Sequence, residues 1–376
     1  MSVRKREWVT RKGEAKEAWI ADYTDGTGQR HIQTFAKKKD ADAFAAKTRV
    51  AVNAGVNVNT DLTIAKVAER WIEHATANGL ERATLRQYQQ HVTHHIVPRI
   101  GGLKLKNFTL DHAKHFRASL LTGDNKLSSP MAKKVWVSFK SMLKTGHVSH
   151  LAGDLTIGTG KRNKRRLEVG RDIPTTDEMR RLIGAASFKL KFSTLLKVAA
   201  LTGLRASELR GLRWADVDLK ANELHIRQRA DRWNRIGPPK SDSGTRKIPF
   251  GADLALALKG WKLACPKGGL DLVFPTFEGT VIGYKHFTNR LEPIFKAAHV
   301  VDKHGKPKYA PHAFRHFFAS WCINPKARGG RELPAKVVQE WMGHSSIKIT
   351  LDIYGHLFPH DSDSTEVNKA EKALLG

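Results

Sequence analysis

The stretch that most constrains how this chain folds is a basic, glycine-containing segment at residues 151–171. Gly153, Gly158 and Gly160 loosen its backbone, and Lys161–Arg166 places five cations in six positions. Flexible residues and adjacent like charges oppose packing into a core. We therefore predict a linker here, with independently packed regions before and after it.

The length and charge of the chain agree with several domains and a polyanionic partner. Its 376 residues exceed the roughly 150 of an average domain, and 40% of them are hydrophobic, which allows sizeable cores. The 65 Lys and Arg residues outnumber the 36 Asp and Glu residues, giving a net charge of +29. Such an excess favours nucleic acid, because cations neutralise phosphates and release counterions. Charge alone leaves a ribosome-type RNA binder and a merely soluble basic protein as alternatives.

The cysteines and the apolar runs indicate the compartment. Cys265 and Cys322 are too few for a zinc finger or a disulfide framework and fit buried thiols in a reducing environment. No apolar run approaches the ~20 residues that span a bilayer, and the basic stretch Arg4–Arg6 is not followed by the apolar core of a signal peptide. The sequence therefore predicts a soluble, cytoplasmic protein with no membrane partner.

Residues 1–58 have the pattern of a small α+β module. Alternating apolar residues predict three strands, at 7–10, 17–23 and 30–35. A turn at 25–28 joins the last two strands, and a helix follows from about Asp40. The lysines of this module are dense but scattered, so a DNA-binding sheet and a generic module with a solvated basic face both fit them.

Residues 61–150 show four amphipathic helical patterns. The helices are predicted to begin near Asp61 or Thr63, Thr84, Thr109 and Pro130. This second helix is expected to run through Ile96 and to be stopped by Pro98 and Gly101–Gly102. That helix carries His91, His94 and His95, but the sequence offers no third ligand at metal-site spacing and no HExxH-type glutamate. We interpret these histidines as a helix surface that faces DNA or solvent.

Residues 172–376 predict a third region that is mainly helical. The spacing Thr175–Glu178 is that of a capping box. Gly203 is placed to end a helix in a left-handed conformation. A strand is expected at 223–229, followed by a turn-rich hairpin that closes at 246–249 and gives a small sheet.

Four short motifs in this third region supply groups suited to phosphoryl transfer. They are Thr202–Leu209, with Arg205 and Glu208; Pro239–Ser241, with Lys240; His312–His316, with Arg315; and Gly343–Tyr354, with His344. A phenol, whose ordinary pKa is about 10, attacks phosphorus well only where cations and proton acceptors surround it. Planar guanidinium groups match the phosphate oxygens with paired N–H donors. A tyrosine nucleophile among fixed cations is therefore the chemistry that these residue types indicate.

The motifs, in this order, resemble those of the tyrosine recombinase, or phage integrase, family. The resemblance is tight over 175–360 and loose over 1–58. It implies six catalytic residues, with no cofactor and no metal: Arg205, Lys240, His312, Arg315, His344 and the nucleophile Tyr354. Each of these residues, taken alone, is consistent with an ordinary solvated or core side chain. Only their combination favours catalysis.

The resemblance implies a role for each of these residues. Arg205 and Arg315 bind the non-bridging oxygens, and His344 bonds one of them. Lys240 is the general acid for the departing 5′ oxygen. His312 accepts the proton of the tyrosine or positions the phosphate.

The nucleophile and the supporting groups have rivals in the sequence. Tyr354 would form a 3′-phosphotyrosine, and Glu208 would hold the first arginine without doing chemistry. Lys247 competes with the hairpin lysine for the role of general acid. Tyr309 is rejected as nucleophile because it lies only three residues before His312.

The resemblance further implies a multidomain fold. Its parts are a small α+β arm-binding domain at 1–58, an all-α core-binding domain at 61–150, the basic linker at 151–171, and a mainly α (α+β) catalytic domain with a small antiparallel sheet at 172–376. The linker residues expected to contact DNA are Lys161, Arg162, Lys164, Arg165 and Arg166. A nuclear-localisation signal and a merely solvated linker are the alternatives for that run.

The implied function is site-specific recombination by the integrase of a prophage or other integrative element. Its partners would be double-stranded DNA with core and arm sites, three further copies of the chain in a tetramer on a Holliday junction, and an excisionase and a DNA-bending protein. Two alternatives are a non-catalytic DNA-binding regulator and a type IB-like DNA-relaxing enzyme. A chromosome-dimer resolvase is disfavoured because it would not need residues 1–58.

Two further segments carry expectations. The segment 324–330 resembles an insertion into a surface loop outside the site. The tail is expected to end in an amphipathic helix with Val367, Ala370 and Leu374 on one face. That helix would pack on a neighbouring protomer or on its own domain.

Overall fold

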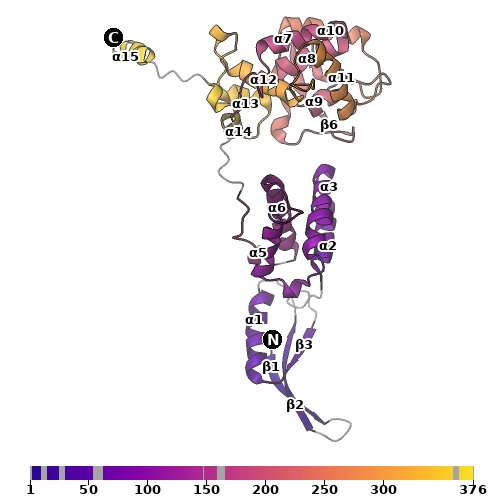
Figure 1. Ribbon diagram of the computed structural model, residues 1–376, viewed down its shortest axis with the longest axis vertical. Coiled ribbons are helices and arrows are strands. Elements are labelled where there is room, and N and C mark those ends of the chain that lie inside the picture. Colours follow the sequence, from indigo (N-terminus) through magenta and orange to yellow (C-terminus); the bar gives the residue numbers. More distant parts are fainter. Residues whose placement is uncertain are drawn as a thin grey trace. The chain divides into compact units, whose positions relative to one another are not determined.

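The computed structural model describes residues 2–9, 15–24, 30–53, 62–146, 148–158, 166–358 and 364–375. The contacts between residues divide the chain into two compact units, Met1–Asn163 and Lys164–Gly376 (Figure 1). Within the described ranges, no helix has both the length and the apolarity needed to cross a membrane. The fold class expected from the sequence is confirmed, since helices dominate and the sheets are small and antiparallel.

The chain begins with a three-stranded antiparallel sheet and one helix. The strands are β1 (Ser2–Val9), β2 (Ala15–Thr24) and β3 (Arg30–Phe35), in the order β1-β2-β3, and the helix is α1 (Lys38–Asn53). Ile20 and Tyr23 of β2 are buried, as are Ala41 and Ala45 of α1, which packs against all three strands. The three predicted strands are confirmed, with β1 beginning earlier than expected. The predicted turn at 25–28 lies outside the described residues.

The second part of this unit is helical (Figure 1). Its helices are α2 (Ile64–Ala77), α3 (Arg82–His91), the π-helical turn η1 (Val92–Ile96), α4 (Val97–Ile100), α5 (Leu110–Ser119) and α6 (Ser129–Thr145). The buried side chains Phe116, Trp136 and Phe139 form the aromatic centre of its core. All three lie on α5 and α6, two of the four helices predicted from the sequence.

Local capping explains where two of these helices, α2 and α5, begin. The hydroxyls of Thr63 and Thr109 accept hydrogen bonds from the first turns of α2 and α5, as predicted. The prediction for Thr84 is wrong, because α3 already begins at Arg82. The predicted stop is confirmed at the glycines and wrong at the proline: a π turn, Val92–Ile96, lies directly before Pro98, and the helix continues to Ile100, next to Gly101. Such a turn shifts the hydrogen-bond register around a residue that has no N–H.

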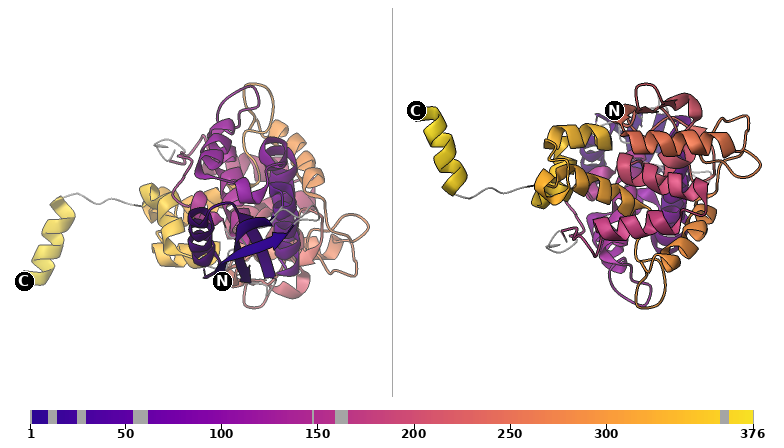
Figure 2. Two further views of the ribbon diagram at one scale, coloured as in Figure 1. Left: turned by 90° about the horizontal axis from the view of Figure 1, so that it is seen from below. Right: turned by 90° about the horizontal axis from the view of Figure 1, so that it is seen from above.

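The second unit is a larger helical domain with two small sheets. Its helices are α7 (Thr176–Ala185), α8 (Leu190–Thr202), α9 (Ala206–Gly211), α10 (Ala252–Ala264), α11 (Tyr284–Ala297), α12 (His312–Ile323), α13 (Ala335–Met342), α14 (Ile347–Tyr354) and α15 (Ser364–Leu375). The buried helix α8 contacts α7, α10 and α12, so it forms the centre of this domain (Figure 2). The capping box predicted at Thr175 and Glu178 is confirmed at the start of α7.

The sheets of this unit correct the predicted strand at 223–229. β5 (Glu223–Ile226) lies between β4 (Val217–Asp218) and β8 (Arg246–Pro249), whereas β6 (Arg229–Ala230) pairs with β7 (Ile236–Gly237) in a separate sheet. The alternating apolar pattern therefore runs across two strands of different sheets, which periodicity alone does not separate. The hairpin closure at 246–249 is confirmed as β8.

The segment 324–330 and the helix α15 complete the second unit. The segment 324–330 forms a loop with one 3₁₀ turn, Lys326–Arg328, between α12 and α13. In α15, Leu374 and Leu375 are exposed. The helix predicted for the tail is confirmed, and the surface that it packs on stays a prediction.

Candidate active site

Tyr354 is the last residue of α14 and lies inside the second unit. Its side chain is 1% exposed. Its hydroxyl is 2.6 Å from Nδ1 of His316, and its ring stacks on that of His344, with 6.5 Å between centroids and 9° between planes. Burial raises the pKa of Tyr354 above its ordinary value, and the charge of Arg315 offsets only part of that rise. The phenol is thus held neutral among imidazoles and a guanidinium.

Arg315 is a buried cation on α12, 2% exposed. One of its terminal nitrogens donates to the carbonyl of Gly203 at 2.8 Å, and the other donates to the carbonyl of Met342. Burial, followed by the charge of Arg205, lowers the pKa of Arg315 to about 9. The guanidinium therefore stays charged near neutral pH. An anion bound next to this buried cation would be stabilised by its charge.

Arg205 lies at the junction between α8 and α9. Gly203, just before it, ends α8 with φ +61°, and a Cβ added there would lie 2.3 Å from the ring of Phe318. This tight, left-handed turn directs the Arg205 side chain toward α13, where Nη2 donates to the carbonyl of Gly343 at 2.9 Å. The Arg205 side chain is 34% exposed, so the protein covers it only in part.

Glu208 is the carboxylate that orders this end of the site. It is 2% exposed and accepts hydrogen bonds from Arg205 Nη1 at 2.7 Å and from the Arg205 backbone N–H at 2.9 Å. Arg246 donates to both carboxylate oxygens, at 3.2 and 2.9 Å. Burial alone would raise the pKa of Glu208, but Arg246 and then Arg205 lower it to about 2.

Arg246 was not identified as a site residue from the sequence, and it joins one motif to the segments that flank two others. Besides Glu208, its Nε donates to the carbonyl of Trp341 at 2.7 Å, and its Nη1 donates to the carbonyl of Gly244 at 2.9 Å. Its side chain is 5% exposed. Arg246 therefore links the helix that follows Arg205, the hairpin loop and the end of α13. The signal in the sequence was its position in the strand that closes the hairpin.

His344 follows the end of α13 and is buried. Its Nδ1 is 2.9 Å from the hydroxyl of Thr350, and its backbone N–H donates to the carbonyl of Gln339 at 3.1 Å. Burial and the charges of Arg315 and Arg205 lower the pKa of His344 to about 3. The imidazole is therefore neutral near neutral pH, with one nitrogen already fixed by a hydroxyl.

His312 and His316 lie one turn apart on α12. Their rings meet edge to face, 4.6 Å apart at 87°. His312 is exposed at the start of the helix, yet surrounding protein, Arg315 and Arg205 still lower its pKa. His316 lies deeper, and burial with the charges of His312 and Arg315 lowers its pKa to about 4. His316 thus contacts the phenol, a place that the sequence had given to His312.

Lys240 is exposed on the loop between β7 and β8. This loop packs on the segment before His344, since a Cβ added to Gly343 would lie 2.8 Å from the carbonyl oxygen of Ser243. The rival Lys247 lies on β8 and pairs with Glu223 at 3.5 Å. The loop lies against the arginine and histidine segments, and the role of Lys240 as general acid stays a prediction.

The remaining sequence candidates lie apart from this cluster or outside the described residues. Tyr309 donates its hydroxyl to the buried Glu178 at 2.7 Å, in a network with Lys308. His91 is buried with its Nδ1 2.8 Å from the hydroxyl of Ser138, and the described residues contain no group of three metal-ligand side chains. Four linker cations lie outside the described residues: Lys161, Arg162, Lys164 and Arg165. Arg166 is described and exposed.

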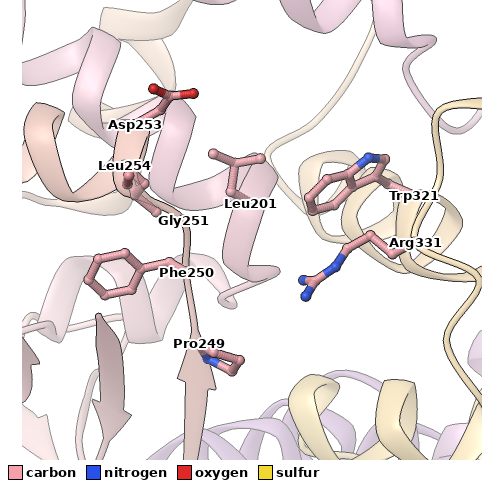
Figure 3. A pocket seen from close by; sticks show the side chains of 9 residues that line it. Leu201, Pro249, Phe250, Gly251, Asp253, Leu254, Trp321 and Arg331 are labelled. Atoms are coloured by element: carbon pink, nitrogen blue, oxygen red, sulfur yellow. The ribbon is translucent and has the colours of Figure 1, made fainter. Parts of the chain in front are cut away.

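A separate cavity of about 480 Å³ lies elsewhere in the second unit (Figure 3). Its lining is mostly apolar and includes Leu201, Phe250 and Leu254. Arg331 also lines it, next to Trp321, with its guanidinium 5.3 Å from the centroid of that ring. The six predicted catalytic residues are not among its lining, so the candidate active site and this cavity are different places.

The pairing of Glu208 predicts a measurable contribution to stability. Glu208→Gln leaves Arg205 and Arg246 without their shared carboxylate, and we expect it to lower the free energy of unfolding near neutral pH by about 3 kcal/mol. Because the folded-state pKa of Glu208 is lowered from its ordinary 4.5 to about 2, the stabilisation is present above 4.5 and lost as the pH falls toward 2. Denaturant unfolding at several pH values measures the difference.

Glu292→Gln is the matched control, because Glu292 and Lys296 form an exposed pair on one helix at 2.8 Å. We expect that change to cost less than about 1 kcal/mol at every pH. If the loss in free energy of unfolding in Glu208→Gln is as small as in the control, the assigned pairing is wrong. The pairing is also wrong if that loss does not become smaller at acidic pH.

Two family models match the chain. The phage integrase family matches residues 174–360. The N-terminal SAM-like domain of phage integrases matches residues 63–121. The first range contains the whole cluster described above, from the segment before α7 to beyond Tyr354.

Two curated relatives are named as a recombinase and an integrase. A protein named tyrosine recombinase XerC-like, from Caldanaerobacter subterraneus subsp. tengcongensis, is 23% identical over 348 residues, which are 86% of each chain. The ICEBs1 integrase of Bacillus subtilis is 28% identical over 177 residues, 46% of each chain, so that match spans less than half of that relative.

Solved structures show the same fold. The Tn1549 transposon integrase in complex with a circular intermediate DNA has a TM-score of 0.62 at 19% identity, covering 83% of this chain and 99% of that one. The lambda integrase tetramer bound to a Holliday junction has a TM-score of 0.55 at 15% identity, covering 95% of each chain. At these identities the likeness concerns the fold.

Proposed function

The chain belongs to the phage integrase family of tyrosine recombinases, and from this premise we propose that it is a site-specific DNA recombinase with Tyr354 as its nucleophile. The observation that carries the assignment is the position of the Tyr354 hydroxyl. It lies at hydrogen-bond distance from His316, with His344 stacked on the ring and with the charge of Arg315 acting on the phenol. A nucleophile, proton acceptors and fixed cations are thus gathered in one domain.

The two arginines of the motifs bind the phosphate to be attacked. Charge builds on the non-bridging oxygens as the attacking oxygen approaches phosphorus, and preorganised N–H donors stabilise that charge. Arg205 is partly exposed and so accessible to a phosphate oxygen, while Glu208 holds its Nη1. Arg315 is held by two backbone carbonyls, so its guanidinium does not reorient during the reaction.

His344 contributes a neutral donor to the same oxygens. If the hydroxyl of Thr350 donates to Nδ1 of His344, the proton of the imidazole is on Nε2, which can then donate to a non-bridging oxygen. His312, exposed beside His316, is placed to bond a second oxygen. This assignment uses His312 for positioning the phosphate, one of the two roles expected from the sequence.

Lys240 is assigned as the acid for the leaving group. Attack by Tyr354 forms a 3′-phosphotyrosine and breaks the bond from phosphorus to the 5′ oxygen, which takes a proton from the ammonium of Lys240. The loop that carries Lys240 packs on Gly343, beside His344, which supports this placement. The 5′ hydroxyl of another strand reverses the step, and no nucleoside triphosphate is needed because the phosphotyrosine retains the energy of the broken phosphodiester.

The partners follow from the same premise. We assign residues 61–150 and 172–376 to the core site of double-stranded DNA, residues 1–58 to arm sites, and the basic linker at 151–171 to the phosphate backbone between them. Four copies of the chain exchange strands through a Holliday junction, the assembly named for the lambda integrase structure of similar fold. An excisionase and a DNA-bending protein set the direction, and the element is a prophage or another integrative element of a bacterial chromosome, which places the reaction in the cytoplasm.

Recombination between two sites tests the function as a whole. Core sites are first selected by the protein from a pool of random-sequence duplexes and then cloned into two plasmids. We expect joint products only when both plasmids carry a site. Relaxation of any supercoiled plasmid without exchange would instead identify a DNA-relaxing enzyme, and binding without cleavage of a nicked site would identify a regulator.

A further inference from the structure

The hydrogen bond to the nucleophile identifies a residue outside the six that the motifs supply. In the described part of the chain, the hydroxyl of Tyr354 is hydrogen-bonded to Nδ1 of His316, at 2.6 Å. The two rings are inclined at 59° with centroids 5.7 Å apart, so the imidazole meets the hydroxyl with its edge. The ring of His312 contacts that of His316 edge to face, with centroids 4.6 Å apart.

The state of His316 suits a proton acceptor. The charged and titratable groups that act on it are His312 and Arg315 from its own helix, Asp172 from the segment before α7, and Tyr354 from α14. Burial and the two neighbours on its helix keep His316 neutral at neutral pH, and Asp172 opposes them only weakly. If this neutral imidazole carries its proton on Nε2, its Nδ1 accepts the O–H of Tyr354.

We propose that His316 is the catalytic residue that accepts the proton of Tyr354 during strand cleavage. The proposal rests on the function proposed above. The O–H bond of Tyr354 breaks and its proton moves to Nδ1 of His316, while an oxygen electron pair forms the bond to phosphorus. The bond to the 5′ oxygen breaks, and that oxygen takes the proton of Lys240. In rejoining, the departing Tyr354 oxygen recovers its proton from the His316 imidazolium.

Two features of the reaction make this transfer feasible although free phenol is a weak acid. The phenolic oxygen loses its basicity as it bonds to phosphorus, so the proton leaves as the bond forms and no free phenolate is needed. The incoming phosphate also brings negative charge beside Arg315, which partly cancels the field that disfavours imidazolium at His316.

Single-turnover cleavage of a nicked duplex tests the proposal. The duplex carries a core site selected as above, and the covalent protein–DNA adduct is followed in time. His316→Asn keeps a hydrogen-bonding group near the position of Nδ1 but is not a base. We expect it to bind the duplex as the wild type does and to cleave about 10²-fold more slowly near pH 7.

The pH profile separates proton acceptance from simple positioning. Without a base, the variant depends on hydroxide to form the phenolate, so the ratio of wild-type to variant rates should narrow by up to about tenfold per pH unit from about pH 7 to about pH 9. Effects of pH on Lys240 or on DNA cancel in this ratio. His312→Asn is the matched control. We expect the ratio of wild-type to His312→Asn cleavage rates to stay constant with pH.

Other outcomes overturn the proposal. A His316→Asn rate equal to or above the wild type would make His316 a latch on a resting tyrosine. A slow His316→Asn rate, with a ratio of wild-type to variant rates that stays constant with pH, would make His316 a positioning residue. If that ratio narrows with pH only for His312→Asn, His312 is the proton acceptor instead. If His316→Asn does not fold, His316→Ala with imidazole in the buffer replaces it, and no recovery of rate with imidazole refutes proton acceptance. Absence of any adduct with the wild type refutes instead the proposed function.

Discussion

Tyr354→Phe abolishes covalent attachment to DNA and leaves DNA binding unchanged. The change removes one oxygen and keeps the ring, which stays buried and stacked on His344. The lost hydrogen bond leaves His316 without its partner on Nδ1, at a cost to stability of about 1 kcal/mol. Without the hydroxyl there is no nucleophile, so we expect no adduct above background on a nicked core-site duplex.

Tyr309→Phe is the matched control for this experiment. Tyr309 is also a buried tyrosine of the second unit, but its hydroxyl donates to Glu178. We expect that variant to lose some stability and to form the adduct at the wild-type rate. A gel that resolves free protein from protein–DNA adduct reads both variants. An adduct that persists in Tyr354→Phe would remove Tyr354 from the mechanism.

Arg315→Lys lowers the rate of cleavage by about 10²- to 10³-fold while the protein still binds its site. Lysine keeps the positive charge but lacks the planar fork with which Arg315 is bound between the carbonyls of Gly203 and Met342. The ammonium therefore cannot hold that geometry and donate to a phosphate oxygen at once. Single-turnover cleavage with saturating protein separates this loss from any change in affinity.

Arg210→Lys provides the comparison for a buried arginine with a structural role. Arg210 is 3% exposed on α9, and it donates to the carbonyl of Ile282 at 2.7 Å and to Asn234. We expect Arg210→Lys to lower stability and to leave the cleavage rate of the folded protein within a few-fold of wild type. If Arg315→Lys weakened binding and left the rate of the bound complex unchanged, Arg315 would serve affinity and not catalysis.

The helices were predictable from sequence where one local interaction decides their start. Thr63, Thr109 and Thr175 cap helices with their own hydroxyls, and such bonds depend on neighbours within three residues. Thr84 carries the same local signal and fails because the helix gains an earlier turn from Arg82. Pro98 does not end its helix, because a π turn directly precedes it and the helix continues to Ile100, where the predicted glycine stop follows. In both places packing of the helix overrides a local stop or start signal.

The site was predictable only as far as its motifs mark the residues. Three of the four motifs contain Arg205, Arg315, His344 and Tyr354, and the structure joins these residues through hydrogen bonds, ring contacts and shared charge. Arg246 lies 38 residues from the carboxylate that it binds, a distance in sequence over which spacing carries no information. Its role in the site appears only when the hairpin is folded against α9 and α13.

His316 shows a different limit of the sequence. It stands next to Arg315 in a motif already recognised, but adjacency does not say which of two histidines faces the phenol. On a helix, His312 and His316 share one face, so both fit the spacing. The choice depends on depth, because the half-buried His316 meets the phenol on α14, whereas His312 is exposed at the start of α12. Such a difference is a property of tertiary packing.

The most direct test of the central claim is to locate the DNA on the protein. Wild-type adduct formed on a nicked core-site duplex is digested with nuclease and protease, and the modified peptide is sequenced by mass spectrometry. We predict a nucleotide linked through its 3′ phosphate to Tyr354, with a free 5′ hydroxyl on the released strand. A nucleotide on any other residue, or a linkage through a 5′ phosphate, would contradict the account.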